Sequence, residues 1–458
     1  MGQLGNRAIV LGGSMAGLLA ARVLSDHFAR VVLVERDHFP PPGEPRKGVP
    51  QGRHLHGLLA GGLRALQEMF PEFLSRALAR GGIAVDVGDF GPWYIGNVQS
   101  LPIKSGLQGL LMSRPLFETH VREQVLGYGN IEPMAGWSAV SLLGDARAVR
   151  GVRVSQREAT GVSERELHAD LVVDATGLGS RTPRWLREVG LEAPAEEDVK
   201  ADIVYTSCYI RRRPHHLSGR ECYIISPAPP SLRSGAALAV EGDRYIITLT
   251  SYLGDVAPAT YADMIEYARS LIGPGLYELL LDAEPLSEPV HYRDPISRRR
   301  RYERLKSFPA GLLVIGDALC HFNPAYGQGM SVAALEAQAL AASLSAVDPR
   351  PLWRRFFRAA APIVDIPWAI VTGGDFAFPG VVGQRPPGTA IANAYFARLN
   401  RAAAVDPRVV EARLKVMHLT APLGSLFSPA VMARVFLHAG KSRPLVAPAI
   451  APAPAAAE

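Results

Sequence analysis

The chain has 458 residues, of which 48% are hydrophobic and 20% charged, so it has material for a large core and is not a disordered protein. Its formal charge of +6 is modest, and apart from an arginine run at residues 298–301 the basic residues are spread along the sequence. No nucleic-acid module accompanies that run, so no nucleic-acid partner is expected. We expect a solvated edge leading into a strand, with some of these arginines also candidates for an anionic cofactor.

Three cysteines, Cys208, Cys222 and Cys320, show no metal-ligand or redox spacing, and no charged-plus-apolar leader precedes the first strand. We therefore expect a reduced cytoplasmic protein without a bound metal. Every apolar run is interrupted before the roughly 18 residues that a membrane span requires, so no stable membrane span is predicted. Residues 409–437 are apolar at helical spacing. We expect them to pack on the body of the protein, with attachment to a membrane surface as the alternative.

The first 35 residues organise the chain. An apolar strand, residues 8–11, runs into a turn of small residues and an Ala/Leu-rich helix, and the next apolar run ends on Glu35. Gly12 and Gly17 would let the backbone approach a pyrophosphate, while the helix N-terminus offers N–H groups and Glu35 can accept hydrogen bonds from a ribose. Ser14 stands at the middle glycine of the G-x-G-x-x-G pattern. The pattern predicts a βαβ dinucleotide fold, and the alternative is an ordinary Gly-rich turn.

A polar loop at residues 46–56 follows and leads into a helix. Its arginine, lysine, glutamine and histidine side chains, so close to a nucleotide fold, suggest a loop against the cofactor. The alternative is solvated side chains with histidines that cap the helix. His54 and His56 cannot share one helical face, so metal binding is not expected there. Further on, residues 76–103 predict strands and loops, Ser113 begins a helix, and residues 138–143 and 148–154 predict a strand pair.

Two later strands end in the same way as the first. One strand of buried type ends in Asp174-Ala-Thr-Gly177, where a small-residue loop can sit beneath a nucleotide. The other ends on Asp317, whose carboxylate can hold polyol hydroxyls, and the Gly-rich turn after it would let a flat ring lie against bare backbone. A helix predicted from Ser331 to Ala341 then directs its partial positive charge at that ring.

Between these two strands, from about Arg187 to Lys306, the pattern becomes antiparallel and predicts a substrate platform. After Ser345 the chain is predicted to be helical, either as a lid on a long hydrophobic pocket or as a cap on the core. Residues 444–458, rich in Ala and Pro, predict a disordered, dispensable tail.

The predicted platform has strands at 203–211, 222–225, 236–240, 245–250 and 289–292 and a helix at 261–272.

In order and spacing these motifs resemble the FAD motifs of single-component flavoprotein monooxygenases of the hydroxybenzoate-hydroxylase and squalene-epoxidase type. The resemblance covers about residues 7–345. Over residues 46–56 and 323–331 the sequence is similar in more detail to the bacterial polyene epoxidases of lasalocid- and monensin-type polyether biosynthesis. The motifs that carry it are Gly12-x-x-x-x-Gly17 with Glu35, Asp174-Ala-Thr-Gly177, and Gly316-Asp317-Ala318 with Pro324-x-x-Gly327-x-Gly329.

The resemblance implies an α/β protein with a Rossmann-like FAD-binding domain, an antiparallel-sheet substrate domain and a C-terminal helical region. The FAD-binding domain would be discontinuous. The expected boundaries are 1–75, 104–186 and 307–345 for the FAD-binding domain, 76–103 and 187–306 for the substrate domain, 346–443 for the helical region and 444–458 for the tail.

The resemblance also implies which residues meet FAD. The first turn would bind the pyrophosphate, Glu35 and Arg36 the adenosine ribose, and Asp317 the ribityl chain. Arg114 would lie near the pyrophosphate or adenine, and the loop after Asp317 would meet the isoalloxazine. The expected cofactor residues are Gly12, Gly13, Ser14, Met15, Ala16, Gly17, Glu35, Arg36, Arg46, Gln51, His54, Arg114, Asp174, Gly177, Asp317, Pro324, Gly327, Gln328, Gly329 and Met330.

The activity that the resemblance implies begins with reduction of FAD by NAD(P)H or a partner flavin reductase. O₂ then forms a C4a-hydroperoxyflavin, which passes one oxygen atom to an alkene of a hydrophobic polyketide or terpenoid. The cofactor carries this chemistry, so no catalytic side chain is expected. The alternatives are an aromatic hydroxylase on the same scaffold, an FAD-dependent prenyl reductase, and a non-catalytic flavin- or polyketide-binding protein.

Overall fold

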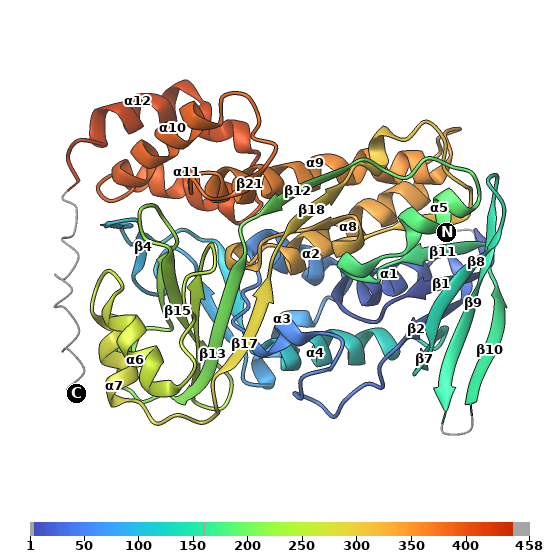
Figure 1. Ribbon diagram of the computed structural model, residues 1–458, viewed down its shortest axis with the longest axis horizontal. Helices are drawn as coiled ribbons and strands as arrows, with labels where there is room; N and C mark the ends of the chain where they lie inside the picture. Colours follow the sequence, from blue (N-terminus) through green and yellow to red (C-terminus); the bar gives the residue numbers. More distant parts are fainter. Residues whose placement is uncertain (1–3, 159–160, 443–458) are drawn as a thin grey trace, which may run out of the picture.

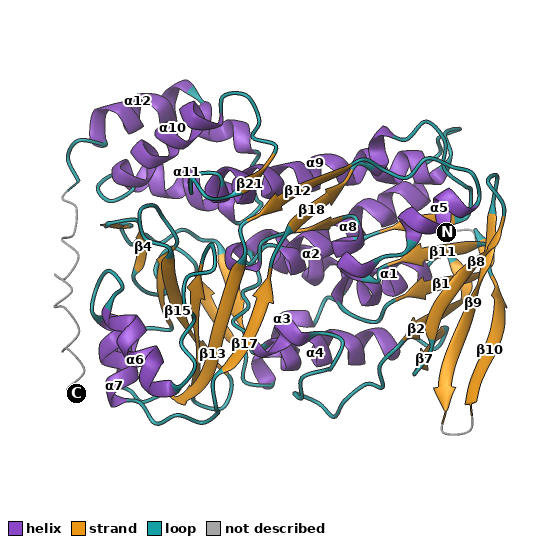
Figure 2. Cartoon of the chain, in the orientation of Figure 1, coloured by secondary structure: helices purple, strands orange, loops and turns teal. Residues whose placement is uncertain are grey.

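The computed structural model describes residues 4–158 and 161–442 and has a mixed α/β architecture (Figures 1 and 2). A five-stranded parallel sheet has the strand order β19-β11-β1-β2-β7. Its central strands are runs of Val, Ile and Leu buried on both faces, the pattern of parallel strands covered by helices. The strands are β1 (Gly5–Leu11), β2 (Phe28–Glu35), β7 (Ile131–Ala135), β11 (Leu171–Asp174) and β19 (Leu312–Val314).

Three helices pack together beside this sheet: α1 (Met15–Ser25) contacts both α4 (Arg114–Leu126) and α8 (Gly329–Ser345). Leu11 at the end of β1 pairs with Val34 of β2 and with Asp174 of β11. The carboxyl ends of these strands therefore meet at one edge, which is where parallel sheets bind ligands. The parallel sheet and the α1 crossover confirm the predicted Rossmann-like fold.

A three-stranded antiparallel sheet flanks the parallel one: β8 (Ser138–Gly144), β9 (Val149–Glu158) and β10 (Gly161–His168). The pairing of β8 with β9 confirms the predicted strand pair. The prediction that residues 76–103 lack helix is wrong at its start, because α3 reaches Ala79 with Phe73 and Ala77 buried. The other elements here are α2 (Ala60–Met69), α3 (Phe73–Ala79), α5 (Thr182–Glu188) and the pair β3 (Ile83–Asp86) and β6 (Gln108–Leu111).

A seven-stranded, mainly antiparallel sheet forms the second layer, in the order β17-β13-β16-β15-β14-β4-β5. One face packs on α6 (Tyr261–Arg269) and α7 (Gly275–Asp282) around alternating side chains such as Ile247 and Leu249. The predicted strands are confirmed, whereas the short helix α7 had no prediction. The strands are β4 (Trp93–Ile95), β5 (Val98–Gln99), β13 (Ile203–Arg211), β14 (Cys222–Ser226), β15 (Arg233–Val240), β16 (Arg244–Ser251) and β17 (Val290–Asp294).

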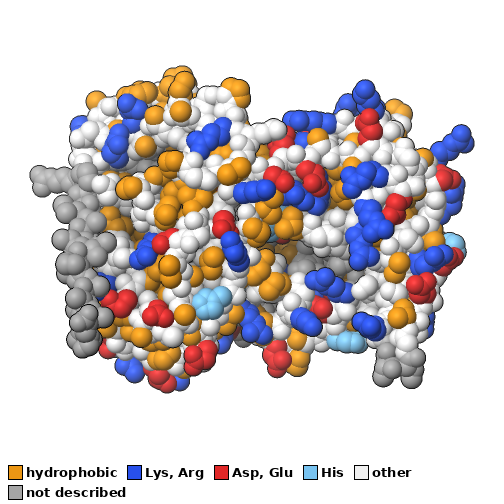
Figure 3. All heavy atoms as spheres, viewed as in Figure 1, with side chains coloured by type: hydrophobic (Ala, Val, Ile, Leu, Met, Phe, Trp, Pro, Cys, Tyr) orange, Lys and Arg blue, Asp and Glu red, His pale blue; other side chains and the backbone are white. Residues whose placement is uncertain are grey.

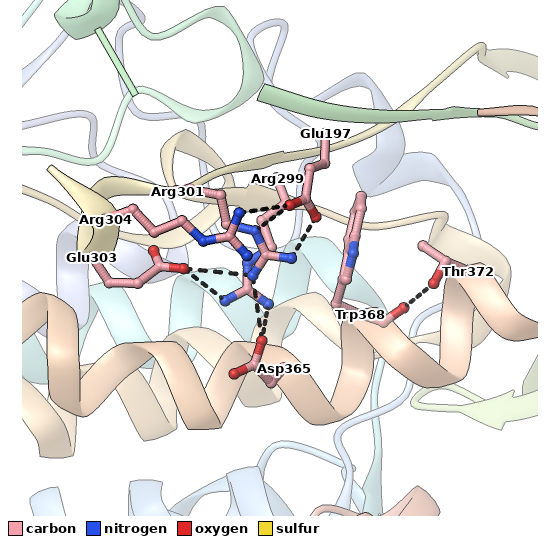
Figure 4. A network of polar contacts seen from close by, with 8 residues as sticks. All are labelled: Glu197, Arg299, Arg301, Glu303, Arg304, Asp365, Trp368 and Thr372. Atoms are coloured by element: carbon pink, nitrogen blue, oxygen red, sulfur yellow. Dashed lines mark hydrogen bonds and ion pairs between the residues drawn. The ribbon is translucent and has the colours of Figure 1, made fainter. Parts of the chain in front are cut away.

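The arginine run 298–301 lies in a separate sheet of order β20-β18-β12-β21. Arg299 and Arg300 are buried, so the prediction of a solvated edge is wrong for both. Arg299 Nη1 donates to Asp365 Oδ1 at 2.5 Å, and Arg301 pairs with Glu197 (Figure 4). Acidic side chains of this chain thus neutralise these arginines. The strands are β12 (Glu196–Lys200), β18 (Ser297–Arg300), β20 (Cys320–His321) and β21 (Val382–Gly383).

The C-terminal part is helical, as predicted. The long helix α9 (Leu352–Asp375) lies along α8, and the other helices form a lobe at one end of the molecule (Figure 1). Among the described residues, none of the helices has the length and apolar character needed to cross a membrane. The tail predicted at 444–458 lies outside the described residues. The lobe contains α10 (Thr389–Ala402), α11 (Pro407–Met417) and α12 (Pro429–His438).

Candidate functional site

One cavity of about 430 Å³ opens at the carboxyl edge of the parallel sheet. Its walls come from the turn after β1, the end of β2, the 46–56 loop, the loop after β11, the end of β17 and the segment from Asp317 to Ala333. Segments far apart in sequence therefore converge on one site. Sixteen of the twenty residues predicted to meet the cofactor line this cavity, and the exceptions are Gly13, Gly17, His54 and Asp174.

The first turn is packed so closely that only glycine fits at two positions. Gly12 has φ +100°, and a Cβ there would lie 2.5 Å from the carbonyl oxygen of Ala175. A Cβ on Gly17 would lie 1.8 Å from the carbonyl oxygen of Gly12, so Gly17 permits the packing of α1 on the strand rather than a ligand contact. The Ser14 side chain at the N-cap makes no capping hydrogen bond. Within the described part of the chain, no side chain therefore caps the first turn of α1, whose N–H groups lie at the cavity.

A buried ionic network supports this turn. Arg46 Nη1 lies 2.7 Å from Glu35 Oε2, and Arg46 Nη2 lies 3.1 Å from Glu118 Oε1. Arg114 Nη2 donates to Glu118 Oε2 at 2.7 Å and to Ser14 Oγ at 2.9 Å. Burial raises the pKa of Glu118, but Arg114 and Arg46 outweigh burial and the pKa lies below its usual value. The network holds two arginines at the cavity wall with their charges balanced.

The hydrogen bonds of the Ser14 hydroxyl explain why a serine is tolerated in place of the middle glycine of the motif. This hydroxyl donates to Glu118 Oε2 at 2.9 Å while it accepts from Arg114. Glu35 accepts from the Gly13 N–H at 2.6 Å through Oε2 and from the Asp37 N–H at 3.0 Å through Oε1. Glu118 was not predicted, although its position one helical turn after Arg114 is the spacing of an ion pair.

The opposite end of the cavity presents bare backbone. Gly327 has φ +65°, and no heavy atom lies within 4 Å of the position of an added Cβ. Gly329, the first residue of α8, has only Asp317 Oδ1 near its Cβ position, at 3.8 Å. Gln328, the N-cap of α8, makes no capping hydrogen bond, and its buried Oε1 has no partner among the described residues. A flat group can therefore approach a second helix N-terminus here.

Asp317 is held by a histidine that the sequence interpretation did not select. His321 Nδ1 lies 3.0 Å from Asp317 Oδ2, and His321 Nε2 lies 2.9 Å from Asp294 Oδ2 at the end of β17. Burial lowers the pKa of His321, but the two carboxylates outweigh it and raise the pKa to about 10. His321 is therefore an imidazolium at neutral pH. It lies next to the predicted motif, but Asp294 carried no sequence signal.

The two histidines of the 46–56 loop are both neutral but face different groups. Burial lowers the pKa of His54 to about 4, and its Nδ1 lies 2.7 Å from Ser207 Oγ on the seven-stranded sheet. His54 thus joins the loop to the second sheet. Burial lowers the pKa of His56 to about 3. His56 Nδ1 donates to the carbonyl oxygen of His54 at 3.0 Å, so its Nε2 is left as an acceptor on a side chain that lines the cavity.

A second buried network holds the loop beside Gly327. Asn323, on the cavity wall, donates through Nδ2 to Asp375 Oδ1 at 2.9 Å and accepts through Oδ1 from Tyr205 OH at 3.0 Å. Burial raises the pKa of Asp375 to about 7. The network links α9 and β13 to this loop, so its position depends on both.

Asp174 has a role inside the protein. Its side chain is fully buried and accepts from Thr176 N at 2.9 Å and from the hydroxyls of Ser180 and Thr182 at 2.6 and 2.5 Å. It fixes the loop that carries Gly177, which does line the cavity. As contacts of a cofactor, all twenty residues stay predictions.

The chain was compared with known proteins by sequence and by structure, and one protein is similar to it over nearly its whole length. No family model matches the chain. Protein Rv3254 of Mycobacterium tuberculosis is 31% identical over 459 residues, which cover 95% of this chain and 95% of that protein.

Three solved structures are similar in fold. A flavoprotein/dehydrogenase from Cytophaga hutchinsonii matches with a TM-score of 0.69 and 15% identity, covering 95% of this chain and 98% of that one. The flavin-dependent brominase Bmp2 matches with a TM-score of 0.64 and 14% identity over 94% and 98%. PqsL of Pseudomonas aeruginosa, a probable FAD-dependent monooxygenase, matches with a TM-score of 0.59 and 18% identity over 82% and 99%. At these identities the likeness establishes the fold alone, which the chain shares with these three proteins.

Proposed function

The chain belongs to the same family as the Mycobacterium tuberculosis protein Rv3254, and we propose that it is an FAD-dependent monooxygenase that acts on a hydrophobic small molecule. One observation carries this proposal. Two helix N-termini without side-chain caps, those of α1 and α8, open into a single cavity, with glycine backbone exposed at each. A dinucleotide with a diphosphate at one end and a flat, electron-accepting ring at the other matches such a site.

The residues present fit FAD. The N-terminus of α1 and Arg114 would hold the diphosphate, and Glu35 with Arg36 would hold the adenosine ribose. Asp317 contacts His321 through Oδ2, so its Oδ1 would bind a ribityl hydroxyl. His56 Nε2 is an acceptor on the same cavity wall. Gly327 would lie against the ring because a side chain there would occupy the space that the ring needs.

When bound, FAD would supply activation of O₂ and transfer of one oxygen atom to the substrate. The chain's own contribution is to bind, orient and exclude water. The N-terminus of α8 would stabilise negative charge at the edge of the ring that faces it. The imidazolium of His321 offsets part of the negative charge of Asp294 and Asp317 and keeps Asp317 in one orientation. No side chain of this site is assigned a nucleophilic or general-base role.

We further propose that the substrate is an alkene of a polyketide or terpenoid and that the product is an epoxide, with NAD(P)H or a partner reductase as electron donor. The support is the resemblance of residues 46–56 and 323–331 to the polyene epoxidases. The decisive experiment is turnover under ¹⁸O₂ with polyene and aromatic candidates, followed by mass spectrometry. One ¹⁸O atom in an epoxide is expected. A labelled phenol would assign an aromatic hydroxylase, and anaerobic turnover would assign a reductase.

The cofactor itself is tested separately. Purified protein should show flavin absorbance or gain it on reconstitution with FAD, with one FAD per chain. A colourless protein that cannot be reconstituted would overturn the assignment, whatever substrate was tried.

A further inference from the structure

The C-terminal lobe is strongly basic, and its net charge equals that of the whole chain. Between residues 376 and 442 the sequence has eight Lys or Arg residues and two acidic residues, which gives the same +6 as the full chain. Both acids are paired within the lobe: Asp406 lies 3.0 Å from Arg434, and Glu411 lies 2.8 Å from Lys415. The face of α10 and α12 in Figure 3 accordingly shows Lys and Arg without Asp or Glu. This lobe therefore favours an anionic partner.

The same lobe exposes large apolar side chains. Phe436 and Leu437, adjacent on α12, are 61% and 64% exposed, and Phe427 is 40% exposed. The opposite side of α12 is anchored by Val435, which is fully buried. The outward side chains are therefore the result of a helix that packs by one side only, and they cannot turn inward without unpacking it.

The basic and apolar groups form one surface. Arg398 and Arg401 of α10 line a shallow hollow together with Phe436. Phe427 stacks on Tyr395 with ring centroids 5.0 Å apart, which places this aromatic side chain beside the same pair of helices. We call Phe427, Phe436, Leu437, Arg398 and Arg401 the C-terminal patch.

We propose that the C-terminal patch docks on a lipid surface rich in anionic phospholipids, with Phe436 and Leu437 among the acyl chains and Arg398 and Arg401 at the phosphates. Apolar side chains that project from a basic, acid-free helical face are the combination that interfacial binding requires. The patch lies on a lobe whose helices α10 and α12 contribute no lining residue to the cavity. The proposal therefore stands apart from the proposed function, although a membrane would be a natural source of a hydrophobic substrate.

The sequence pattern predicted that the apolar residues of this region would all pack on the body of the protein. Residues 409–437 were expected to pack on the body, and Val409, Val410 and Leu414 of α11 are indeed buried. Phe436 and Leu437, at the end of that segment, are exposed. The docking surface thus combines the end of α12 with α10, which the sequence interpretation did not pair with it.

The test is co-sedimentation of the full chain with vesicles of phosphatidylcholine alone or of phosphatidylcholine with phosphatidylglycerol. Binding is expected only to the anionic vesicles and should weaken as salt is raised. The double variant Phe436→Ser/Leu437→Ser should lower the partition coefficient by about tenfold or more, because it removes apolar side chains from the interface. Arg398→Gln/Arg401→Gln should abolish the preference for anionic lipid.

Val347→Ser is the matched control. Val347 is fully exposed outside the patch, so its substitution should leave vesicle binding unchanged. Thermal melts and flavin content of all variants report folding and cofactor loading, independently of lipid. Failure of the proposed flavin chemistry would therefore not alter the vesicle result.

Four outcomes would overturn the proposal. Absence of binding to anionic vesicles, or binding that survives both double variants, would remove the lipid surface as the partner. A dimer in sedimentation velocity that Phe436→Ser/Leu437→Ser dissociates, without vesicle binding, would assign the patch to a contact between copies of the chain. Retention on an acidic protein in place of vesicles would assign it to a protein partner.

Discussion

The imidazole Nδ1 of His321 lies 3.0 Å from the carboxylate Oδ2 of Asp317. Through its other nitrogen His321 also reaches Asp294 at the end of β17, so one ring joins the parallel-sheet side of the site to the seven-stranded sheet. The orientation of Asp317 thus depends on a residue that arrives from the second sheet. Cofactor binding at Asp317 should respond to changes at His321.

Asp317→Ala should abolish stoichiometric FAD binding, because it removes the carboxylate expected to accept a ribityl hydroxyl. His321→Gln should weaken FAD binding by a smaller factor, about tenfold, since the loss of the positive charge leaves two carboxylates facing each other. Fluorescence titration of the apoprotein with FAD measures both. His291→Gln, on the exposed side of β17, is the control, and full retention of FAD in Asp317→Ala would contradict the assignment.

Glu118→Gln should destabilise the protein by about 3 kcal/mol, because the buried Arg46 and Arg114 lose a charged partner that is itself buried. Glu123→Gln on the same helix is a matched control. Its carboxylate pairs with Arg80 at the surface and is 41% exposed, so a loss of less than about 1 kcal/mol is expected. Urea denaturation followed by circular dichroism measures both. Equal effects of the two substitutions would show that the buried network does not stabilise the fold.

Gly327→Leu should eliminate turnover while the protein stays folded. A Cβ at Gly327 meets no heavy atom within 4 Å, so the side chain would enter the space assigned to the flavin ring, at a strain cost of about 1 kcal/mol for φ +65°. Gly388→Leu is the control, since Gly388 has φ +82° and equally open surroundings but lies outside the cavity lining. Reductant oxidation and a thermal melt are compared for both. Full activity in Gly327→Leu would refute the ring position.

The elements that the sequence predicts well are those set by local patterns. Strands β1, β2, β11 and β19 are short apolar runs that end at small or acidic residues, and the strands of the second sheet alternate between turns. Most of the residues predicted on these strand ends and turns therefore line the cavity. Asp294, Asn323 and Glu118 were not, because their roles arise from contacts with residues 27, 52 and 104 positions away.

The arginine run at residues 298–301 also shows that a local pattern does not reveal contacts with distant residues. Its composition indicates a charged edge, but the partners that make Arg299 a buried residue are Glu303 and Asp365, and Asp365 lies on α9. A run of like charges does not reveal whether opposite charges will meet it in the fold. The sheet β20-β18-β12-β21 contains long-range pairs of this kind between β12 and β18, and no local pattern predicts them.

Glu336→Gln tests a buried carboxyl beneath the turn that carries Asp317. Glu336 Oε2 accepts from the Gly316 N–H at 2.7 Å, and burial raises the pKa of Glu336 from 4.5 to about 8. Between those pH values the unfolded chain releases a proton that the folded chain retains. Wild-type stability should therefore fall as the pH rises through this window, by up to about 1.4 kcal/mol per pH unit.

A glutamine keeps the acceptor for Gly316 and cannot ionise, so stability of the variant should depend less on pH from 4.5 to 8, and its advantage over wild type should grow toward pH 8. Urea midpoints across that range measure the difference. Glu266→Gln, on the exposed side of α6, should give a curve parallel to that of wild type. Parallel curves for Glu336→Gln and wild type would mean that Glu336 is ionised in the folded protein, and the turn beneath the site would then hold a charge rather than a proton.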